Sequence, residues 1–122
     1  NFTNNHIENS WVGIELHDSM QNNLINNFVN LTAAGIYMLN SDNNNLNLII
    51  LYGSWFGAYL TEDSDNNLLK DNTATGNVND IYLETDSNNN TGCNYAPIIV
   101  DNNANSVYTT PFDNMYLSSI FA

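Results

Sequence analysis

The stretch Gly35-Ile-Tyr-Met-Leu39, followed by Ser41-Asp-Asn-Asn44, decides the fold of this 122-residue chain. Apolar Ile36 and Met38 flank Tyr37, and such alternation is typical of a β-strand with one buried face. The polar run that follows suits a turn, because Asn tolerates left-handed backbone angles and bonds its own backbone. One strand and one Asn-rich turn therefore form the unit from which we read the rest of the chain.

This unit recurs at a nearly fixed spacing. Asn pairs stand at Asn22-Asn23, Asn44-Asn45, Asn66-Asn67 and Asn89-Asn90, which gives steps of 22, 22 and 23 residues. A second marker has the same phase and stands at Gly13-Ile14, Gly35-Ile36, Gly57-Ala58 and Asp80-Ile81. Asn enrichment alone would produce Asn pairs, but it would not place a Gly-Ile marker at the same spacing, so the chain contains internal repeats.

Alternation within each repeat separates an inward face from an outward face. The inward positions form two columns, Ile14, Ile36, Ala58, Ile81 and Leu16, Met38, Leu60, Leu83. The outward position between them holds Glu15, Tyr37, Tyr59 and Tyr82. Two further apolar runs per repeat, one beginning at Leu24 and one at Trp11, supply a second and a third short strand. Like residues stack because each coil lies about 4.8 Å from the next.

We therefore predict an all-β fold, a single-stranded parallel β-helix of about five coils of roughly 22 residues in one domain. Residues 1–21 are expected to form a short first coil, 22–90 the regular coils, and 91–110 a last irregular coil. Residues 111–122 are expected to be a C-terminal cap or assembly tail. The chain begins part-way through a repeat, so we expect it to be a piece of something longer.

Asparagine makes up 27 of the 122 residues and predicts a stacked polar ladder. An Asn at the same turn of every coil can bond its amide to the Asn above and below. We expect the buried ladder to consist of the second Asn of each pair, Asn23, Asn45, Asn67 and Asn90. The alternative is that Asn only fits the backbone angles of the turn.

The charge balance limits the partners. Thirteen acidic residues face one basic residue, Lys70, and the net charge is −12. Nucleic acid is not an expected partner, because its phosphates need Lys and Arg. Anionic membranes and polyuronic acids are disfavoured for the same reason, which leaves cations, neutral glycans and other proteins. No apolar run of about 20 residues is present, so we expect no membrane span.

An acidic corner is the candidate metal site. Its carboxylates follow the Tyr strands and are those of Asp42, Glu62, Asp63, Asp65 and Asp86. Oxygen ligands gathered in this way suit Ca²⁺, and we expect no other cofactor. The alternative is a solvated acidic edge. A separate candidate is Asn30, which begins an Asn-Leu-Thr glycosylation triplet in an expected turn.

The outward Tyr37, Tyr59 and Tyr82 form the candidate binding surface, which we call the Tyr stripe. Stacked aromatic rings can bind sugar rings or a partner protein. The alternative is that Tyr is present because it favours strands and packs across them.

The segments Asn22-Asn-Leu-Ile-Asn-Asn27, Gly35-Ile-Tyr-Met-Leu39 and Ser41-Asp-Asn-Asn44 resemble right-handed parallel β-helix repeats. Such repeats occur in pectate-lyase-like proteins, in the periplasmic copper-maturation protein of nitrous-oxide reductase, and in archaeal and bacterial surface proteins. The resemblance covers roughly residues 4–90 and implies the right-handed form. Enzymes of this kind use clustered carboxylates with a basic residue, or several Asp together, whereas this chain has no Arg and a solitary Lys70.

These observations lead to three functional hypotheses. The first is a non-catalytic structural or assembly module, located extracellularly or at the cell surface, that stacks end to end or joins neighbouring domains of a larger surface protein. The second is a carbohydrate-binding or adhesion module that uses the Tyr stripe. The third is a degenerate polysaccharide-active enzyme.

Overall fold

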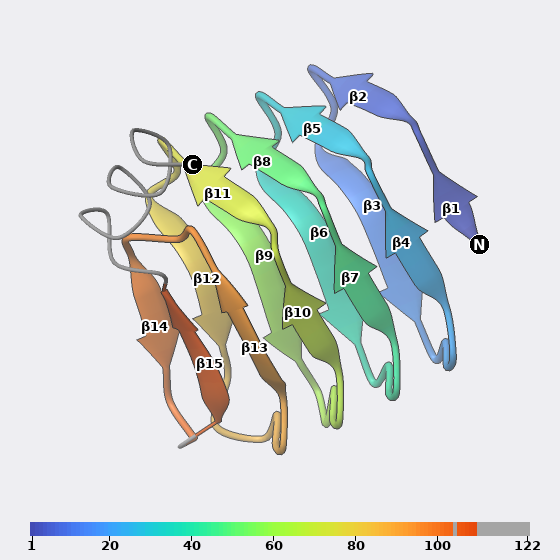
Figure 1. Ribbon diagram of the computed structural model, residues 1–122, viewed down its shortest axis with the longest axis vertical. Coiled ribbons are helices and arrows are strands. Elements are labelled where there is room, and N and C mark those ends of the chain that lie inside the picture. Colours follow the sequence, from blue (N-terminus) through green and yellow to red (C-terminus); the bar gives the residue numbers. More distant parts are fainter. Residues whose placement is uncertain (104, 110–122) are drawn as a thin grey trace, which may run out of the picture.

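One chain winds through three parallel β-sheets in stacked coils, as the computed structural model shows (Figure 1). The structure describes residues 1–103 and 105–109. Every regular element in this part of the chain is a strand, and each full coil adds one strand to each sheet. The predicted parallel β-helix of about five coils is therefore confirmed. None of the described residues belongs to a helix that is long and apolar enough to cross a membrane.

Each sheet collects equivalent strands from successive coils. Sheet A contains β1 (Phe2–Thr3), β4 (Asn23–Ile25), β7 (Asn45–Asn47), β10 (Leu68–Lys70), β13 (Thr91–Asn94) and β15 (Ser106–Thr109). Sheet B contains β2 (His6–Glu8), β5 (Phe28–Asn30), β8 (Ile50–Tyr52) and β11 (Thr73–Thr75). Sheet C contains β3 (Val12–His17), β6 (Ala34–Leu39), β9 (Phe56–Thr61), β12 (Asn79–Leu83) and β14 (Ile99–Asp101).

The register of sheet C agrees with the predicted columns. Tyr59 pairs with Tyr37 on one side and with Tyr82 on the other. Its neighbours in β9, Ala58 and Leu60, point into the core, where they are 1% and 0% exposed. Side chains on a strand alternate between its two faces, so the core lies inside the three sheets and the Tyr stripe lies outside.

The first and the last coil of the solenoid differ in length. The first coil is full length rather than short, because Phe2 pairs with Leu24, 22 residues later. The last coil is shorter, since Thr91 pairs with Ser106 after only 15 residues. In that coil sheet B receives only an isolated bridge, at Tyr95. The predicted cap or tail at 111–122 lies outside the described residues.

The third strand of each coil also lies elsewhere than predicted. The apolar run at Trp11 leads directly into β3 and is part of the sheet C strand rather than a strand of its own. Sheet B is built instead from segments such as β5, in which only the central Val29 is buried. Asn30, expected in a turn, is the last residue of β5 and is half-buried.

Four sharp turns per coil connect the strands, and nearly all of them contain a non-glycine residue with positive φ. Grouped by equivalent turns of successive coils, these residues are Asn4, Asn26, Leu48 and Asp71 at the first turn; Asn9 and Leu31 at the second; Asp18, Asn40, Glu62 and Asp63 at the third; and Gln21, Asn43, Asn66 and Asn89 at the fourth. Gly53 and Gly76 complete the second turn. The preference for Asn follows, because Asn adopts this conformation more readily than most residues.

At most turns, the residue after the left-handed position makes the hydrogen bond that joins neighbouring coils. Asn22 donates its backbone N–H to Oδ1 of Asn44 at 2.8 Å, and Asn44 does the same to Asn67 at 2.8 Å. Asn67 continues the chain to Asn90 at 2.9 Å. At another turn Ser19 donates to Ser41 Oγ, and Ser41 to Ser64 Oγ, each at 3.2 Å. We call these the Asn ladder and the Ser ladder.

The predicted Asn ladder is correct at Asn67 and Asn90 and wrong at Asn23 and Asn45. Asn23 is exposed and Asn45 is half-buried, whereas Asn44 is 1% exposed. The cause is one extra residue in the third coil, where Glu62 and Asp63 both adopt positive φ and earlier coils use a single residue. This insertion moves the ladder from the first Asn of a pair to the second.

The neighbouring residues Asn44 and Asn45 provide a first test of the Asn ladder. Asn44→Ala removes an acceptor for Asn22 N–H and the 2.9 Å bond from Asn44 Nδ2 to the Ser19 carbonyl. We expect the free energy of unfolding to fall by about 2 kcal/mol, since buried backbone groups lose their partners. Asn45→Ala loses only a 3.4 Å exposed bond to Asn23 and should lower it by less than about 0.5 kcal/mol. Urea denaturation followed by circular dichroism measures both, and equal losses would contradict the ladder.

The Ser ladder provides a second matched pair, because Ser64 and Ser87 are both 0% exposed. Ser64 Oγ accepts from Ser41 and donates to the Thr61 carbonyl at 2.7 Å, whereas Ser87 Oγ has no partner among the described residues. Ser64→Ala should destabilise the protein by about 1–2 kcal/mol, and Ser87→Ala should leave stability unchanged or slightly higher. A larger loss at Ser87 would show that hydrogen bonding does not distinguish the two positions.

Candidate binding groove on sheet C

The outer face of sheet C carries a column of alternating large and small side chains. Trp11, Ala33 and Trp55 precede β3, β6 and β9 on three consecutive coils. Backbone bonds hold them in register, from Ala33 N–H to the Trp11 carbonyl at 2.9 Å and from Phe56 N–H to the Ala33 carbonyl at 3.0 Å. The two Trp residues are therefore two coil steps apart, about 10 Å, with only a methyl group between them.

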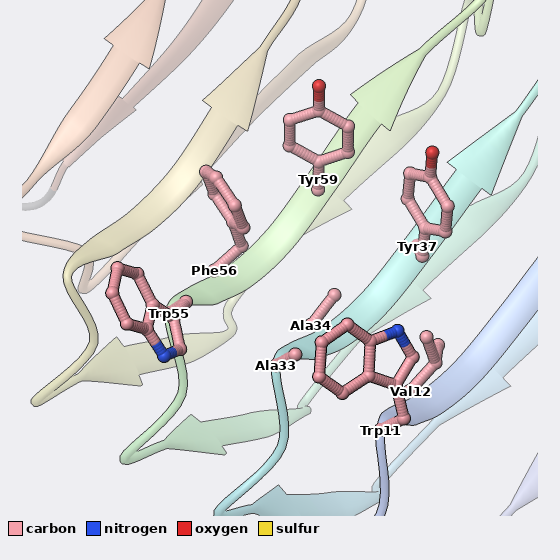
Figure 2. Close-up of a pocket in the computed structure, with 8 residues that line it drawn as sticks. All are labelled: Trp11, Val12, Ala33, Ala34, Tyr37, Trp55, Phe56 and Tyr59. Atoms are coloured by element: carbon pink, nitrogen blue, oxygen red, sulfur yellow. The ribbon is translucent and has the colours of Figure 1, made fainter.

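This alternation creates an aromatic groove with a volume of about 600 Å³. Its lining consists of Trp11, Val12, Ala33, Ala34, Tyr37, Trp55, Phe56 and Tyr59. Figure 2 shows the two Trp residues on either side of Ala33, with the rings of Tyr37 and Tyr59 further along the strands. Small side chains in one coil between large ones in its neighbours thus form the floor, and aromatic rings form the walls.

The two Trp side chains face solvent to an unusual degree, with 84% exposure at Trp11 and 65% at Trp55. Neither contributes much to the core. Large exposed apolar surfaces on a soluble fold typically mark interaction sites. Sequence reasoning missed both residues as site candidates, because it assigned the apolar run at Trp11 to a structural strand. The Trp-Ala-Trp alternation at repeat spacing was the available signal.

The Tyr stripe forms one side of this groove. The ring centroids of Tyr37 and Tyr59 are 5.2 Å apart, and those of Tyr59 and Tyr82 are also 5.2 Å apart with nearly parallel planes. Phe56 packs against Tyr59 at 4.8 Å and Tyr82 at 5.4 Å. Tyr37 and Tyr59 line the groove, whereas Tyr82 lies one coil beyond it. The stripe is therefore half-buried in ring contacts rather than freely exposed.

Carboxylates surround the polar ends of the Tyr rings. The Tyr59 hydroxyl donates a 2.5 Å hydrogen bond to Glu84 Oε1. Burial, together with this bond, raises the pKa of the Tyr59 hydroxyl above its usual value. Burial also raises the pKa of Tyr37, followed by the negative charges of Glu62 and Glu15. The groove thus combines a neutral aromatic interior with an acidic margin.

The carboxylates of the predicted calcium site fall into two groups in the structure. Asp42 Oδ1 accepts the Asp65 N–H at 2.8 Å, and Asp65 Oδ1 accepts the Asn88 N–H at 2.6 Å. These two carboxylates therefore act between coils, while Glu62, Asp63 and Asp86 are exposed. Within residues 1–103 and 105–109, no three His, Cys, Asp or Glu side chains are placed to hold a metal ion. The calcium site remains a prediction without geometric support.

The glycosylation candidate lies in a constrained position. The Asn30 side-chain oxygen is buried and has no hydrogen-bond partner among the described residues. Thr32, which completes the triplet, is 5% exposed and shares a 2.8 Å bond with Ser54 Oγ. Modification at Asn30 would need this segment to open, and it too remains a prediction.

Comparison with known proteins agrees with this architecture. The profile of the family described as "Right handed beta helix region" matches residues 1–117. Searches of curated proteins and of solved structures gave no significant match. The stacked parallel coils and a family match over nearly the whole chain lead to one conclusion: the chain belongs to the right-handed β-helix family.

Proposed function

We propose that this chain is a non-catalytic module of a secreted or cell-surface protein that binds a neutral glycan in the aromatic groove. The observation that carries the proposal is the pair of exposed indoles, Trp11 and Trp55, on either side of the Ala33 floor. A module that only extends a solenoid gains nothing from two solvent-facing Trp rings.

A glycan fits the chemistry of this groove. Pyranose rings have apolar C–H faces that stack on aromatic rings, and their rims carry hydroxyl groups. The indoles of Trp11 and Trp55 offer the flat platforms, and their separation of about 10 Å is comparable to the length of a disaccharide unit in an extended chain. Tyr37 and Tyr59 add hydroxyl groups to the largely apolar lining, and a few polar groups in an otherwise apolar site commonly orient a ligand.

The charges favour a neutral ligand. Glu15, Glu62 and Glu84 lie close enough to Tyr37 to influence its ionisation, and the chain has one basic residue in all. Carboxylates accept hydrogen bonds from sugar hydroxyls but repel uronate or sulfate groups. A glycan partner and a net charge of −12 also favour a secreted or cell-surface setting.

The lining supports the proposal of binding without turnover. Glycoside cleavage ordinarily uses two carboxyl groups on either side of the scissile bond. The groove residues that the structure describes are aromatic or aliphatic. Glu84, at the margin, is occupied by the Tyr59 hydroxyl. This arrangement supports recognition in preference to a polysaccharide-active enzyme.

Removing one platform tests the proposal. Titration calorimetry with neutral β-linked oligosaccharides of glucose, mannose and N-acetylglucosamine should detect binding to the unaltered protein. Trp55→Ala should weaken it about tenfold or more, equivalent to about 1.4 kcal/mol. The matched control is Tyr52→Ala, which removes a 51% exposed aromatic ring from sheet B and should leave affinity unchanged. Absence of binding to all of these sugars, or equal losses in both variants, would overturn the proposal.

Filling the floor tests the shape of the groove separately from its aromatic content. Ala33→Trp keeps every existing ring and places a third one between Trp11 and Trp55. If the ligand enters between the two indoles, affinity should fall about tenfold or more, although aromatic area has increased. An increase in affinity would instead indicate a continuous flat platform, with the ligand lying across all three coils.

A further inference from the structure

The triplet Asn89-Asn90-Thr91 has the Asn-X-Ser/Thr form of an N-glycosylation site. Asn89 is the left-handed residue of the last turn of the fourth coil, with a φ of 54°, and Thr91 begins β13. Asn90, between them, is 0% exposed, whereas Asn89 and Thr91 are both exposed. The buried middle residue therefore leaves the side-chain amide and the hydroxyl of the triplet on the outer surface.

The exposure of Asn89 follows from the way this turn is built in the regular coils. Asn66, one coil earlier, is likewise an exposed left-handed residue, and the buried ladder residue Asn67 follows it. The ladder bonds hold the second residue of each pair inside, as the bond from Asn67 N–H to Asn90 Oδ1 at 2.9 Å shows. The first residue of the pair is outside the ladder and faces solvent.

The polar side chains of the triplet are not used by the fold. Within the described part of the chain, neither the Asn89 side-chain amide nor the Thr91 hydroxyl takes part in a hydrogen bond. The ladder amide of Asn90, by contrast, donates to the Ser64 carbonyl at 3.0 Å. A glycan is bulky and belongs on the surface, so Asn89 Nδ2 can carry one without the loss of a contact that joins the coils.

The triplet at Asn30 differs in both respects. Asn30 Oδ1 is buried, and Thr32 is 5% exposed and bonded to Ser54 Oγ. Recognition of a triplet needs both its Asn and its Ser or Thr, and at Asn30 the folded chain covers polar atoms of both. Of these two triplets, the structure therefore presents the one at Asn89.

A glycan on Asn89 lies away from the aromatic groove. Trp55 directly precedes β9, so the indoles of the groove lie where the strands of sheet C begin, whereas Asn89 comes after β12 has ended (Figure 1). The exposed carboxylates of Glu62, Asp63 and Asp86 also follow the ends of these strands, which makes this side of the solenoid a polar margin. The two surfaces can therefore act independently.

We propose that Asn89 is the residue that accepts an N-linked oligosaccharide, a role that rests on the secreted or cell-surface setting of the proposed function. The donor is an oligosaccharide joined to a lipid by a diphosphate. Asn89 Nδ2 attacks the anomeric carbon of its first sugar. The new carbon–nitrogen bond replaces the bond from that carbon to the diphosphate oxygen, Nδ2 loses one proton, and the lipid diphosphate leaves.

The position of Lys70 makes the test direct. It is the one basic residue of the chain, so trypsin cuts the denatured protein into residues 1–70 and 71–122, and the second fragment contains only the triplet at Asn89. We expect mass spectrometry of the protein secreted by a eukaryotic cell line to show a glycan on fragment 71–122. Peptide N-glycosidase should remove this glycan, and Thr91→Ala, at an exposed position, should prevent it without changing the circular dichroism spectrum.

Leu68→Thr provides a matched gain of a site. Leu68 pairs with Thr91 and is 39% exposed, and Asn66 occupies the same turn one coil earlier. In a Thr3→Ala background, which removes the triplet at Asn1, this change should add a glycan to fragment 1–70. Without Leu68→Thr, the same background should leave fragment 1–70 unmodified, because polar atoms of its remaining triplet are buried.

A folded, secreted protein whose fragment 71–122 carries no glycan would overturn the proposal. So would a glycan on fragment 1–70 of the Thr3→Ala protein at the occupancy found on fragment 71–122, because exposure would then not determine which triplet is used. Neither mass measurement involves the groove, so calorimetry with free sugars decides the proposed glycan binding separately.

Discussion

The structure depends on one contact, the hydrogen bond from a backbone N–H at most of the turns to a side-chain oxygen in the next coil. A left-handed residue bends the chain sharply, and the following residue then points its side chain into the interior. There its own backbone is cut off from water, and buried backbone groups need partners. The Asn44 side chain satisfies the Asn22 N–H and the Ser19 carbonyl at once. In the Ser ladder, the serine hydroxyl likewise accepts an N–H from the preceding coil, but it donates to a carbonyl of its own coil, as Ser41 Oγ does to Leu39.

The same close stacking explains the glycine column and where it ends. A Cβ on Gly35 would lie 2.6 Å from the carbonyl oxygen of Gly57 in the next coil, too close for any other residue. The column ends at Asp80, which is 2% exposed. Its carboxylate accepts the Ile98 N–H at 2.9 Å and the Asn77 amide at 3.1 Å. Asp80 therefore takes the place of glycine where the regular coils meet the last, shortened coil. Its carboxylate can bond Asn77 in its own coil and Ile98 in the next one.

Sequence periodicity predicts the columns of sheet C for two independent reasons. The two-residue alternation indicates whether a side chain points inward or outward, and the 22- or 23-residue repeat indicates which residues of neighbouring coils stack. The Asn ladder is less well determined, because Asn44 and Asn45 are identical in type and differ only in which of them follows the left-handed residue. The extra residue at Glu62 and Asp63 shifts this phase without altering any apolar column. Sheet B is harder still to predict, since each of its three-residue strands buries at most one side chain.

The side chains on the outer face of sheet C bear on function, because packing of the core does not determine which residues stand there. Tyr59 contributes to its own sheet by stacking on Tyr82 and by bonding Glu84, so a Tyr at this position is explained by structure alone. Trp11 has no comparable explanation: it is 84% exposed, and the neighbouring coil carries Ala33 where a large residue would have covered it. A sheet that required bulk at this column would not alternate Trp with Ala. The alternation instead leaves a gap beside Ala33 between two exposed indoles, and the proposed glycan site rests on this gap.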